Sequence, residues 1–268
     1  MKRLRLALLA CGLLLVSGCG GPDSASAETV ASVATTRVSM TTAPPTTLET
    51  TPTTSNPPSS PPTTSTEPEP VTWTAAKAEG PVEVFRAPGD ATAFRVLDER
   101  TILGTETVAL VLGGSDAWLE VLLPGRPNGE TGWIRAIDVE RYTVGRQAVV
   151  NLTTRTLQVL ENDEVIFETS VGIGSPSSPT PVGAFFVTDA VRITNPTGPW
   201  GPYAFGLSAR SDSVTEFNGG DGIIGVHGTN RLTSIGEAQS LGCVRLPNDV
   251  MMELSELLSV GSPVTITS

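Results

Sequence analysis

The sequence predicts a mostly β protein, with two small β domains in tandem and one short helix near the C-terminus. From about residue 79 onward, short segments of alternating apolar and polar residues are separated by Gly, Pro and Asn. This pattern is typical of half-buried strands joined by turns. Helical periodicity is clear in one segment, residues 248–258. Between Gly20 and Pro70, large apolar residues are too scarce to form a core.

Residues 1–18 resemble the signal peptide of a bacterial lipoprotein. A basic cluster precedes the apolar run Leu6–Val16, which is too short to span a bilayer as a helix and has the character of a secretory h-region. The small residues directly before Cys19 resemble a lipobox, where cleavage leaves the Cys N-terminal and lipid-modified. We therefore expect an exported protein of the cell envelope, anchored through Cys19 to the outer face of the cytoplasmic membrane. An ordinary signal peptide cut elsewhere, or a Cys buried in a helix, is the alternative.

Residues 19–78 are predicted to form a disordered tether rich in Thr, Pro and Ser. The tract TTAPPTTLETTPTTSNPPSSPPTTSTEPEP contains almost no large apolar side chain. Such a segment cannot bury enough surface to offset the entropy lost on ordering. The tether would let an anchored domain work at a distance from the membrane.

Composition excludes several classes of function. The formal net charge of −11 provides no stripe of Lys and Arg for nucleic-acid phosphates, so no nucleic-acid partner is expected. Once the signal peptide is removed and Cys19 is lipidated, Cys243 is the only free thiol, which excludes an intramolecular disulfide. His227 is the only histidine, so neither a zinc site nor another cofactor is expected.

The first β domain is predicted over residues 79–141. Its strand candidates lie within VEVFRAPGD, TVALVLGG, AWLEVLLPG and TGWIRAIDV. The order Trp118-x-x-Val121 followed by Gly132-Trp133-Ile134 resembles the last strands of bacterial SH3-like domains. The resemblance implies a small SH3-like β-barrel, in which the two Trp residues are core residues or, alternatively, border a ligand groove.

The second β domain is predicted over residues 145–268. The helix Asn248–Leu258 begins at a residue that can cap it, Asn248 or Asp249, and stops before a Gly-Ser-Pro sequence. The strand candidates of this domain are Gln147–Leu152, Thr156–Leu160, Val165–Val171, Gly183–Val187, Ala204–Ser208, Ile223–Val226 and Pro263–Thr267.

Cys243 and His227 carry the chemistry of the second domain. An apolar strand would deliver His227, and Gly242 permits a tight turn that would leave backbone N–H groups pointing at one spot. Acyl transfer needs these parts: a thiol nucleophile, an imidazole that moves protons, and donors for the oxyanion. An adjacent imidazolium would also favour the thiolate. A buried structural Cys and a structural His are the alternative interpretation at this point.

The pattern H-G-T … S-x-G-C-[VI]-R resembles the signature of the L,D-transpeptidase (YkuD-type) catalytic domain. Residues 227–229, Ser240 and residues 242–245 occupy the matching positions, and residues 169–187 resemble the upstream strand and loop of that family. The resemblance covers about residues 145–268. It implies a YkuD-type β-sandwich and a peptidoglycan L,D-transpeptidase, a cysteine acyltransferase.

The resemblance also implies a mechanism. Cys243 would attack the carbonyl of the third residue of a peptidoglycan tetrapeptide stem and expel D-Ala, and an amine would then resolve the thioester into a 3→3 cross-link. His227 would be the general base and then the acid, with the Gly228 carbonyl holding its tautomer. Backbone N–H groups of Gly242 and Cys243, and of Leu241 as a further donor, would meet the oxyanion. Carbapenem-type β-lactams would be covalent inhibitors.

Supporting roles follow for the neighbouring residues. Ser240 would support the loop, and Thr229 would shape the turn after the histidine. Arg245 would brace the loop, pair with a substrate carboxylate, or be the buried partner of a local carboxylate.

Three further residues bear on the substrate pocket. Leu241 stands where many family members carry His, Lys or Asn, so we expect it to alter which substrate binds rather than whether Cys243 reacts. Tyr203 and Trp200 stand where the family places lid or pocket residues, although core packing explains them equally well.

Other classes of protein compete with this interpretation. A sortase-like cysteine transpeptidase also uses Cys, His and Arg on a β scaffold, but its His usually lies much farther upstream and its Cys follows a Thr. A papain-like hydrolase would need a His after Cys243, where the sequence has none. A non-catalytic peptidoglycan-binding lipoprotein would leave Cys243 inert.

Overall fold

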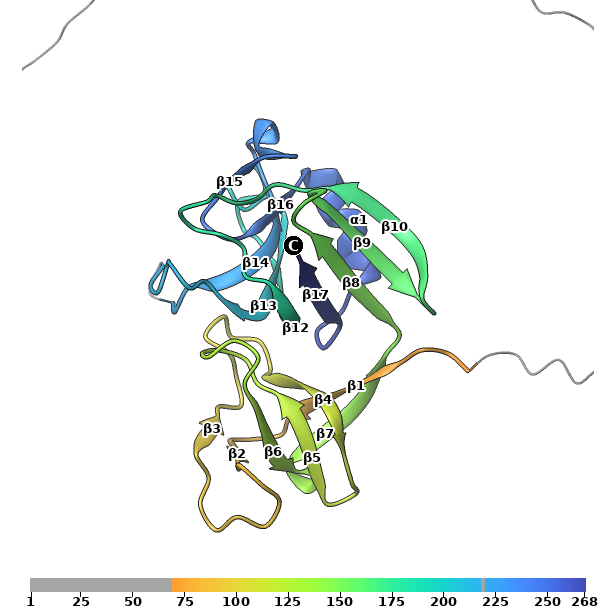
Figure 1. The fold of residues 1–268 in the computed structure, drawn as a ribbon, viewed down its shortest axis with the longest axis vertical. Coiled ribbons are helices and arrows are strands. Elements are labelled where there is room, and N and C mark those ends of the chain that lie inside the picture. Colours follow the sequence, from red (N-terminus) through yellow and green to blue (C-terminus); the bar gives the residue numbers. More distant parts are fainter. Residues whose placement is uncertain (1–68, 218–219) are drawn as a thin grey trace, which may run out of the picture. The chain divides into compact units, whose positions relative to one another are not determined.

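The computed structural model describes residues 69–217 and 220–268. The predicted signal peptide, the lipidation site Cys19 and most of the predicted tether lie outside these residues. The chain divides into two units, Met1–Thr63 and Thr64–Ser268, and every described residue belongs to the second. The second unit contains two β domains and, among the described residues, a single α-helix (Figure 1). In this part of the chain, no helix has the length and apolar character needed to cross a bilayer.

The first β domain is an antiparallel sheet of five strands in the order β6-β5-β4-β1-β7, with a separate β2–β3 pair. Its elements are β1 (Trp73–Ala78), β2 (Val82–Val84), β3 (Arg95–Leu97), β4 (Val108–Gly114), β5 (Trp118–Leu122), β6 (Thr131–Arg135), the 3₁₀ turn η1 (Ala136–Asp138) and β7 (Val139–Val144).

The predicted boundaries of this domain were too narrow. Strand β1 lies in the sheet between β4 and β7, although residues 73–78 were assigned to the tether, and β7 continues past residue 141 to Val144. The sequence of β1, WTAAKA, is rich in Ala and Lys, which are depleted in strands. It forms a strand because its partners on both sides supply the hydrogen bonds and the core.

The two Trp residues of this domain were expected to lie in its core or to border a ligand groove. Neither lies in the centre of the core. Leu119, Val121 and Ile134 are buried in the core, whereas Trp118 and Trp133 alternate with them and are half-buried. Trp118 instead packs edge-on against Phe85, with ring centroids 5.3 Å apart.

The second β domain contains an eight-stranded mixed sheet in the order β10-β9-β8-β17-β12-β13-β14-β16 and a small parallel β11–β15 pair. Its elements are β8 (Arg146–Asn151), β9 (Thr156–Glu161), β10 (Glu164–Ser170), β11 (Ile173–Gly174), β12 (Gly183–Arg192), β13 (Tyr203–Arg210), β14 (Ile223–Gly228), the 3₁₀ turn η2 (Leu232–Ser234), β15 (Ala238–Ser240), β16 (Val244–Leu246), α1 (Asn248–Leu257) and β17 (Pro263–Thr267).

Strand β12 joins the two halves of this sheet. Residues 183–186 pair with β17, and residues 187–192 pair with β13 after a register shift between Val187 and Asp189. A bulge of this kind bends a strand and increases its twist. Residues from both halves and from α1 therefore share one apolar core, and all seven predicted strands of this domain are observed.

The helix α1 begins and ends within one residue of its predicted bounds, but its predicted cap is wrong. Pro247 is the N-cap residue, and no side chain caps the helix. The Asn248 side chain instead donates to the Pro196 carbonyl at 3.3 Å. Met251 and Leu254 anchor the helix in the core of the domain.

Candidate active site

Two adjacent strands bring Cys243 and His227 together. Strands β14 and β16 pair in parallel, with His227 opposite Arg245. Cys243 directly precedes β16, and His227 is the penultimate residue of β14. The two side chains reach the same cavity because the connection between the strands returns the chain to the neighbouring position in the sheet.

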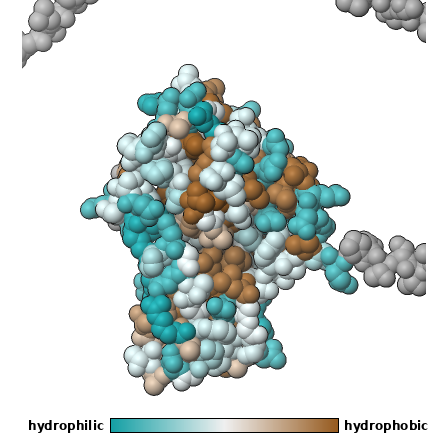
Figure 2. Space-filling view, in the orientation of Figure 1, coloured by the Kyte–Doolittle hydropathy of each residue, from teal (hydrophilic) through white to brown (hydrophobic). Residues whose placement is uncertain are grey.

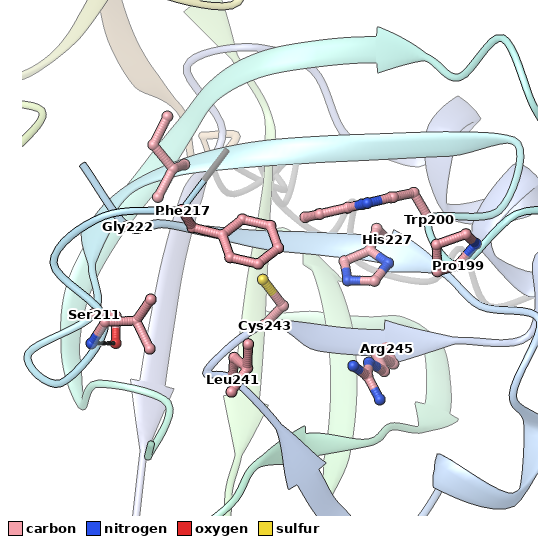
Figure 3. A pocket seen from close by; sticks show the side chains of 11 residues that line it. Pro199, Trp200, Ser211, Phe217, Gly222, His227, Leu241, Cys243 and Arg245 are labelled. Atoms are coloured by element: carbon pink, nitrogen blue, oxygen red, sulfur yellow. Dashed lines mark hydrogen bonds between the residues drawn. The ribbon is translucent and has the colours of Figure 1, made fainter. Parts of the chain in front are cut away.

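That cavity, hereafter the catalytic cavity, has a volume of about 180 Å³. Cys243, His227 and Arg245 all face it (Figure 3). Its remaining lining residues are Pro199, Trp200, Ser211, Val214, Phe217, Gly222, Ile223 and Leu241.

His227 is 3% exposed and held by one polar contact. Its Nδ1 lies 2.6 Å from the Gly228 carbonyl oxygen. Because a carbonyl oxygen only accepts, Nδ1 carries the proton and Nε2 is left as the proton acceptor. The Trp200 ring packs against the imidazole, with centroids 4.5 Å apart. Burial lowers the pKa of His227 to about 4, against the opposing effect of the Gly228 hydrogen bond, and Arg245 lowers it further.

Cys243 is half-buried, and its sulfur accepts a hydrogen bond from the Gly225 N–H at 3.4 Å. Burial raises the pKa of the Cys243 thiol, which the Gly225 hydrogen bond and the Arg245 charge partly oppose. Both members of the pair are therefore neutral at pH 7. The expected thiolate beside an imidazolium does not describe this resting state, since desolvation disfavours both charged forms. Starting from this neutral pair, an attack by the sulfur would need the imidazole to take the thiol proton at the same time.

Ser240 fixes the loop that carries Cys243. Its hydroxyl donates to the Cys243 carbonyl at 2.6 Å and accepts the Gly242 N–H at 3.0 Å. The Gly242 carbonyl accepts from Thr180 Oγ1 at 2.8 Å. Gly242 has a φ of +116°, a conformation that favours glycine. Through these contacts Ser240 holds the turn that precedes Cys243.

The predicted role of the Gly242 N–H as an oxyanion donor does not agree with the hydrogen bonds of this turn. Its N–H already points at Ser240, two residues back in the same turn. The Cys243 N–H, in contrast, donates to no acceptor among the residues that the structure describes. The Leu241 N–H, predicted as a further donor, likewise has no acceptor among the described residues. The amides of Cys243 and Leu241 are therefore the available donors in this turn.

Gly228 is required by a close approach of backbone. A Cβ at residue 228 would lie 2.5 Å from Asn248 Oδ1 and 3.0 Å from the Gly201 Cα. Thr229 follows it, buried, and its hydroxyl accepts the Arg231 N–H at 3.1 Å. This contact places Thr229 in the turn after His227.

Arg245 is a cation that faces the catalytic cavity without a carboxylate. Its backbone pairs with Gly172, N–H to carbonyl at 2.8 Å and the reverse at 2.9 Å. Its buried Nε has no hydrogen-bond partner, and no ion pair to it exists within residues 69–217 and 220–268. The interpretation of Arg245 as the buried partner of a local carboxylate is therefore wrong for the described residues.

The three residues predicted to bear on the substrate pocket differ in location. Leu241 is exposed on the wall of the catalytic cavity. Tyr203 does not line it; its ring packs edge-on against Phe205 with centroids 5.4 Å apart, beside the core. Core packing therefore explains Tyr203, whereas Trp200 lines the cavity.

Sequence reasoning missed several residues of the site. Gly225 contacts the sulfur through its N–H, and Val214 and Phe217 come from the segment between β13 and β14. That segment has no periodicity that would indicate its position. Among the described residues, no cluster of three or more His, Cys, Asp or Glu is arranged to hold a metal ion.

This site combines a cysteine and a proton-accepting histidine in one cavity with a free backbone amide beside them. Such a site is suited to cysteine-dependent acyl transfer. Residues 145–266 match the family model YkuD, the L,D-transpeptidase catalytic domain. The chain belongs to this L,D-transpeptidase family.

Relatives from Bacillus subtilis support the assignment. The protein named "Putative L,D-transpeptidase YkuD" is 30% identical over 153 residues, 57% of this chain and 77% of that protein. The protein named "Putative L,D-transpeptidase YqjB" is 35% identical over 132 residues, 44% of this chain and 69% of that protein. Among solved structures, the L,D-transpeptidase (Yku) from Stackebrandtia nassauensis is 27% identical, with a TM-score of 0.35, over 47% of this chain and 56% of that one.

Proposed function

We propose that this protein is a peptidoglycan L,D-transpeptidase that forms 3→3 cross-links, or attaches other amines to stem peptides, through a thioester on Cys243. The observation that carries the proposal is the presence of Cys243 and His227 in one cavity, with Nδ1 of His227 bonded to the Gly228 carbonyl. That bond leaves Nε2 as the only proton acceptor of the imidazole.

In the first half-reaction, the Cys243 sulfur attacks the carbonyl of the third residue, usually diaminopimelate, of a tetrapeptide stem. The thiol proton passes to Nε2 of His227, and the Cys243 N–H stabilises the oxyanion. Collapse breaks the C–N bond, and the imidazolium returns its proton to the leaving D-Ala amine. The free amide of Cys243 replaces Gly242 as the donor in this scheme.

In the second half-reaction, an amine of another stem attacks the thioester carbonyl. His227 takes a proton from the attacking amine, the C–S bond breaks, and the sulfur recovers its proton. The new amide is the cross-link, and the enzyme returns to the neutral pair.

Arg245 binds the carboxylate of the donor stem in this account. Its buried Nε lacks an acceptor and its side chain lines the catalytic cavity, so a carboxylate there would complete its hydrogen bonds. The replacement Arg245→Met should raise the KM for a donor stem whose carboxylate is free. It should leave unchanged the KM for the same stem with that carboxylate converted to an amide. An equal effect on both donors would exclude this role.

We further propose that the first β domain is an SH3-like barrel. We also propose that the protein is anchored by lipid on Cys19 to the outer face of the cytoplasmic membrane. The anchor is supported by the sequence around Cys19. Detergent partitioning tests it: the unchanged protein should enter the detergent phase and Cys19→Ala should not. Partitioning of both into the aqueous phase would rule out the anchor.

Product analysis tests the proposed reaction. The protein, incubated with disaccharide-tetrapeptide, should release free D-Ala and yield a dimer whose cross-link joins two third-position residues. Cys243→Ala should yield neither. A protein that binds peptidoglycan but gives no product in either form would be the non-catalytic alternative.

A further inference from the structure

A second cavity, hereafter the apolar cavity, adjoins the catalytic cavity. Its volume is about 360 Å³, within the range of small-molecule sites, roughly 300 to 1,000 Å³. Trp200, Phe217 and Ile223 line both cavities. The far wall is formed by the first β domain, through Ile102 and Leu103. In the orientation of Figure 1, apolar surface gathers where the two β domains adjoin (Figure 2).

The loop that carries Ile102 and Leu103 is fastened to the second domain. The hydroxyl groups of Thr101 and Thr105 both donate to Oδ1 of Asp189, the former at 2.5 Å. Asp189 is 2% exposed and lies at the bulge of β12. These hydrogen bonds hold the loop in place. If the loop moved away, the buried Asp189 carboxylate would lose its partners with no water to replace them, which is costly.

The loop between β5 and β6 provides a second attachment. The Asn128 side chain donates to the Arg210 carbonyl and accepts the Arg210 N–H, both at 2.8 Å. The Gly125 N–H donates to the Ser208 carbonyl at 3.1 Å. The first β domain thus extends the hydrogen bonding of β13 and holds its apolar wall beside the catalytic domain.

Gly225 separates the two cavities without a side chain. It lines the apolar cavity, and its N–H contacts the Cys243 sulfur at 3.4 Å. A Cβ at this position would lie 3.2 Å from the Phe205 carbonyl oxygen and 3.9 Å from both that sulfur and Cδ2 of His227. Glycine therefore leaves room for a group from the apolar cavity to reach an acyl chain on Cys243.

The chemistry of the two cavities differs. Arg245 faces the catalytic cavity and suits the carboxylate-bearing donor. The apolar cavity is lined entirely by uncharged residues, which suit the aliphatic part of a peptide, such as alanine methyl groups. A transfer reaction needs a second substrate to approach the thioester while the acyl chain occupies the first cavity.

We propose that the first β domain completes the acceptor subsite of the enzyme, with Ile102 and Leu103 binding the uncharged, alanine-bearing part of the amine-donating peptide. This inference rests on the proposed function and extends it, because it makes the first domain part of the substrate site.

The test uses the full chain with Ile102→Ser and Leu103→Ser combined. Both side chains are exposed, so folding should persist; Ile102→Ser alone serves as a milder second variant. Ile137→Ser is the matched control, an exposed apolar residue of the same domain outside the apolar cavity. Acylation of Cys243 by a tetrapeptide donor is measured in a single turnover, and transfer is measured from the acyl-enzyme to an alanine-bearing amine.

The double variant should acylate at the unchanged rate, show about a tenfold higher KM for the acceptor, and hydrolyse a larger share of the acyl-enzyme. The control should match the unchanged protein in every measurement. Unchanged acceptor use by the double variant overturns this inference alone. Slower acylation with normal transfer assigns the apolar cavity to the donor and also overturns it. Failure of the unchanged protein to acylate or transfer overturns the proposed function together with the inference.

Discussion

The imidazole Nδ1 of His227 lies 2.6 Å from the carbonyl oxygen of Gly228, the next residue in the chain. A backbone carbonyl here has the orienting position that a carboxylate has in many catalytic triads. A carbonyl fixes the tautomer but carries no net charge. It therefore cannot offset the effect of burial, and the pKa of His227 falls to about 4.

The pH dependence of acylation should reflect this low pKa. The reaction needs neutral His227, so the acid limb of kcat/KM should lie near pH 4 rather than near 6.5. Single-turnover acylation from about pH 4 to about pH 8, with circular dichroism to follow folding, measures it. A limb near pH 6.5 in the folded protein would show that the imidazole is solvated or ion-paired.

Stability should fall on the acid side for the same reason. The pKa of His227 is about 4 in the folded state, against 6.5 for an unperturbed histidine, so the unfolded chain binds more protons between these values. The stability that depends on neutral His227 is fully present above about pH 6.5 and is lost as the pH falls to about 4. Urea unfolding should show a loss of about 2 kcal/mol from this group between pH 7 and pH 5.

His227→Asn is the comparison for that measurement, because Asn does not titrate in this range. Its free energy of unfolding should depend less on pH by about that amount. Equal losses in both proteins would assign the acid sensitivity to other groups.

Local sequence patterns were sufficient to predict the seven main strands and the helix of the second domain. Strands β8 and β9 alternate between buried and half-buried residues, β12, β13 and β14 are short apolar runs that are mostly buried, and the helix follows the helical period. The short strands β11, β15 and β16 were not predicted, because two or three residues form a strand only through a partner distant in the sequence. The same reason explains β1, whose Ala-rich sequence has little strand propensity of its own.

That Cys243 and His227 meet in one cavity could be predicted, because both residue types are chemically distinctive and occur in Gly-rich segments. The direction of individual N–H groups could not. Gly242 donates to Ser240 within its own turn, and Gly225 contacts the sulfur from a strand that pairs with β13. Both contacts depend on local backbone angles and on packing between strands, which residue identity leaves open.

Ser240→Ala should damage both the stability and the activity of the protein. The buried hydroxyl serves Gly242 N–H and the Cys243 carbonyl, and both groups would lose a partner away from water. We expect a loss of about 1 to 3 kcal/mol in the free energy of unfolding and slower acylation, measured by urea unfolding and single-turnover kinetics.

Ser255→Ala is the matched control. Its hydroxyl makes one bond, to the Met252 carbonyl on α1, outside the loop that carries Cys243. It should acylate at the unchanged rate. Indistinguishable acylation kinetics for the two variants would show that Ser240 does not support the loop that carries Cys243.

Gly228→Ala should displace His227. The added Cβ would lie within 3.0 Å of both Asn248 and the Gly201 backbone, so the residue after the histidine must move. Overpacking of this kind costs about 1 to 3 kcal/mol, and acylation should fall by at least about tenfold. Thermal unfolding and acylation kinetics measure the two effects. Gly145→Ala, where a Cβ meets nothing within 4 Å, should be close to the unchanged protein; similar behaviour of both variants would contradict the role of this close approach.

The central claim is that Cys243 becomes the acyl-enzyme, and intact-mass spectrometry after incubation with a carbapenem tests it directly. Attack by the sulfur opens the β-lactam ring and the ring nitrogen takes the proton, so the adduct adds the full mass of the carbapenem. The unchanged protein should gain one such mass, located on Cys243 by peptide mapping, and Cys243→Ala should gain none. No adduct on the unchanged protein, under conditions that acylate a known family member, or an adduct that persists in Cys243→Ala, would contradict the account.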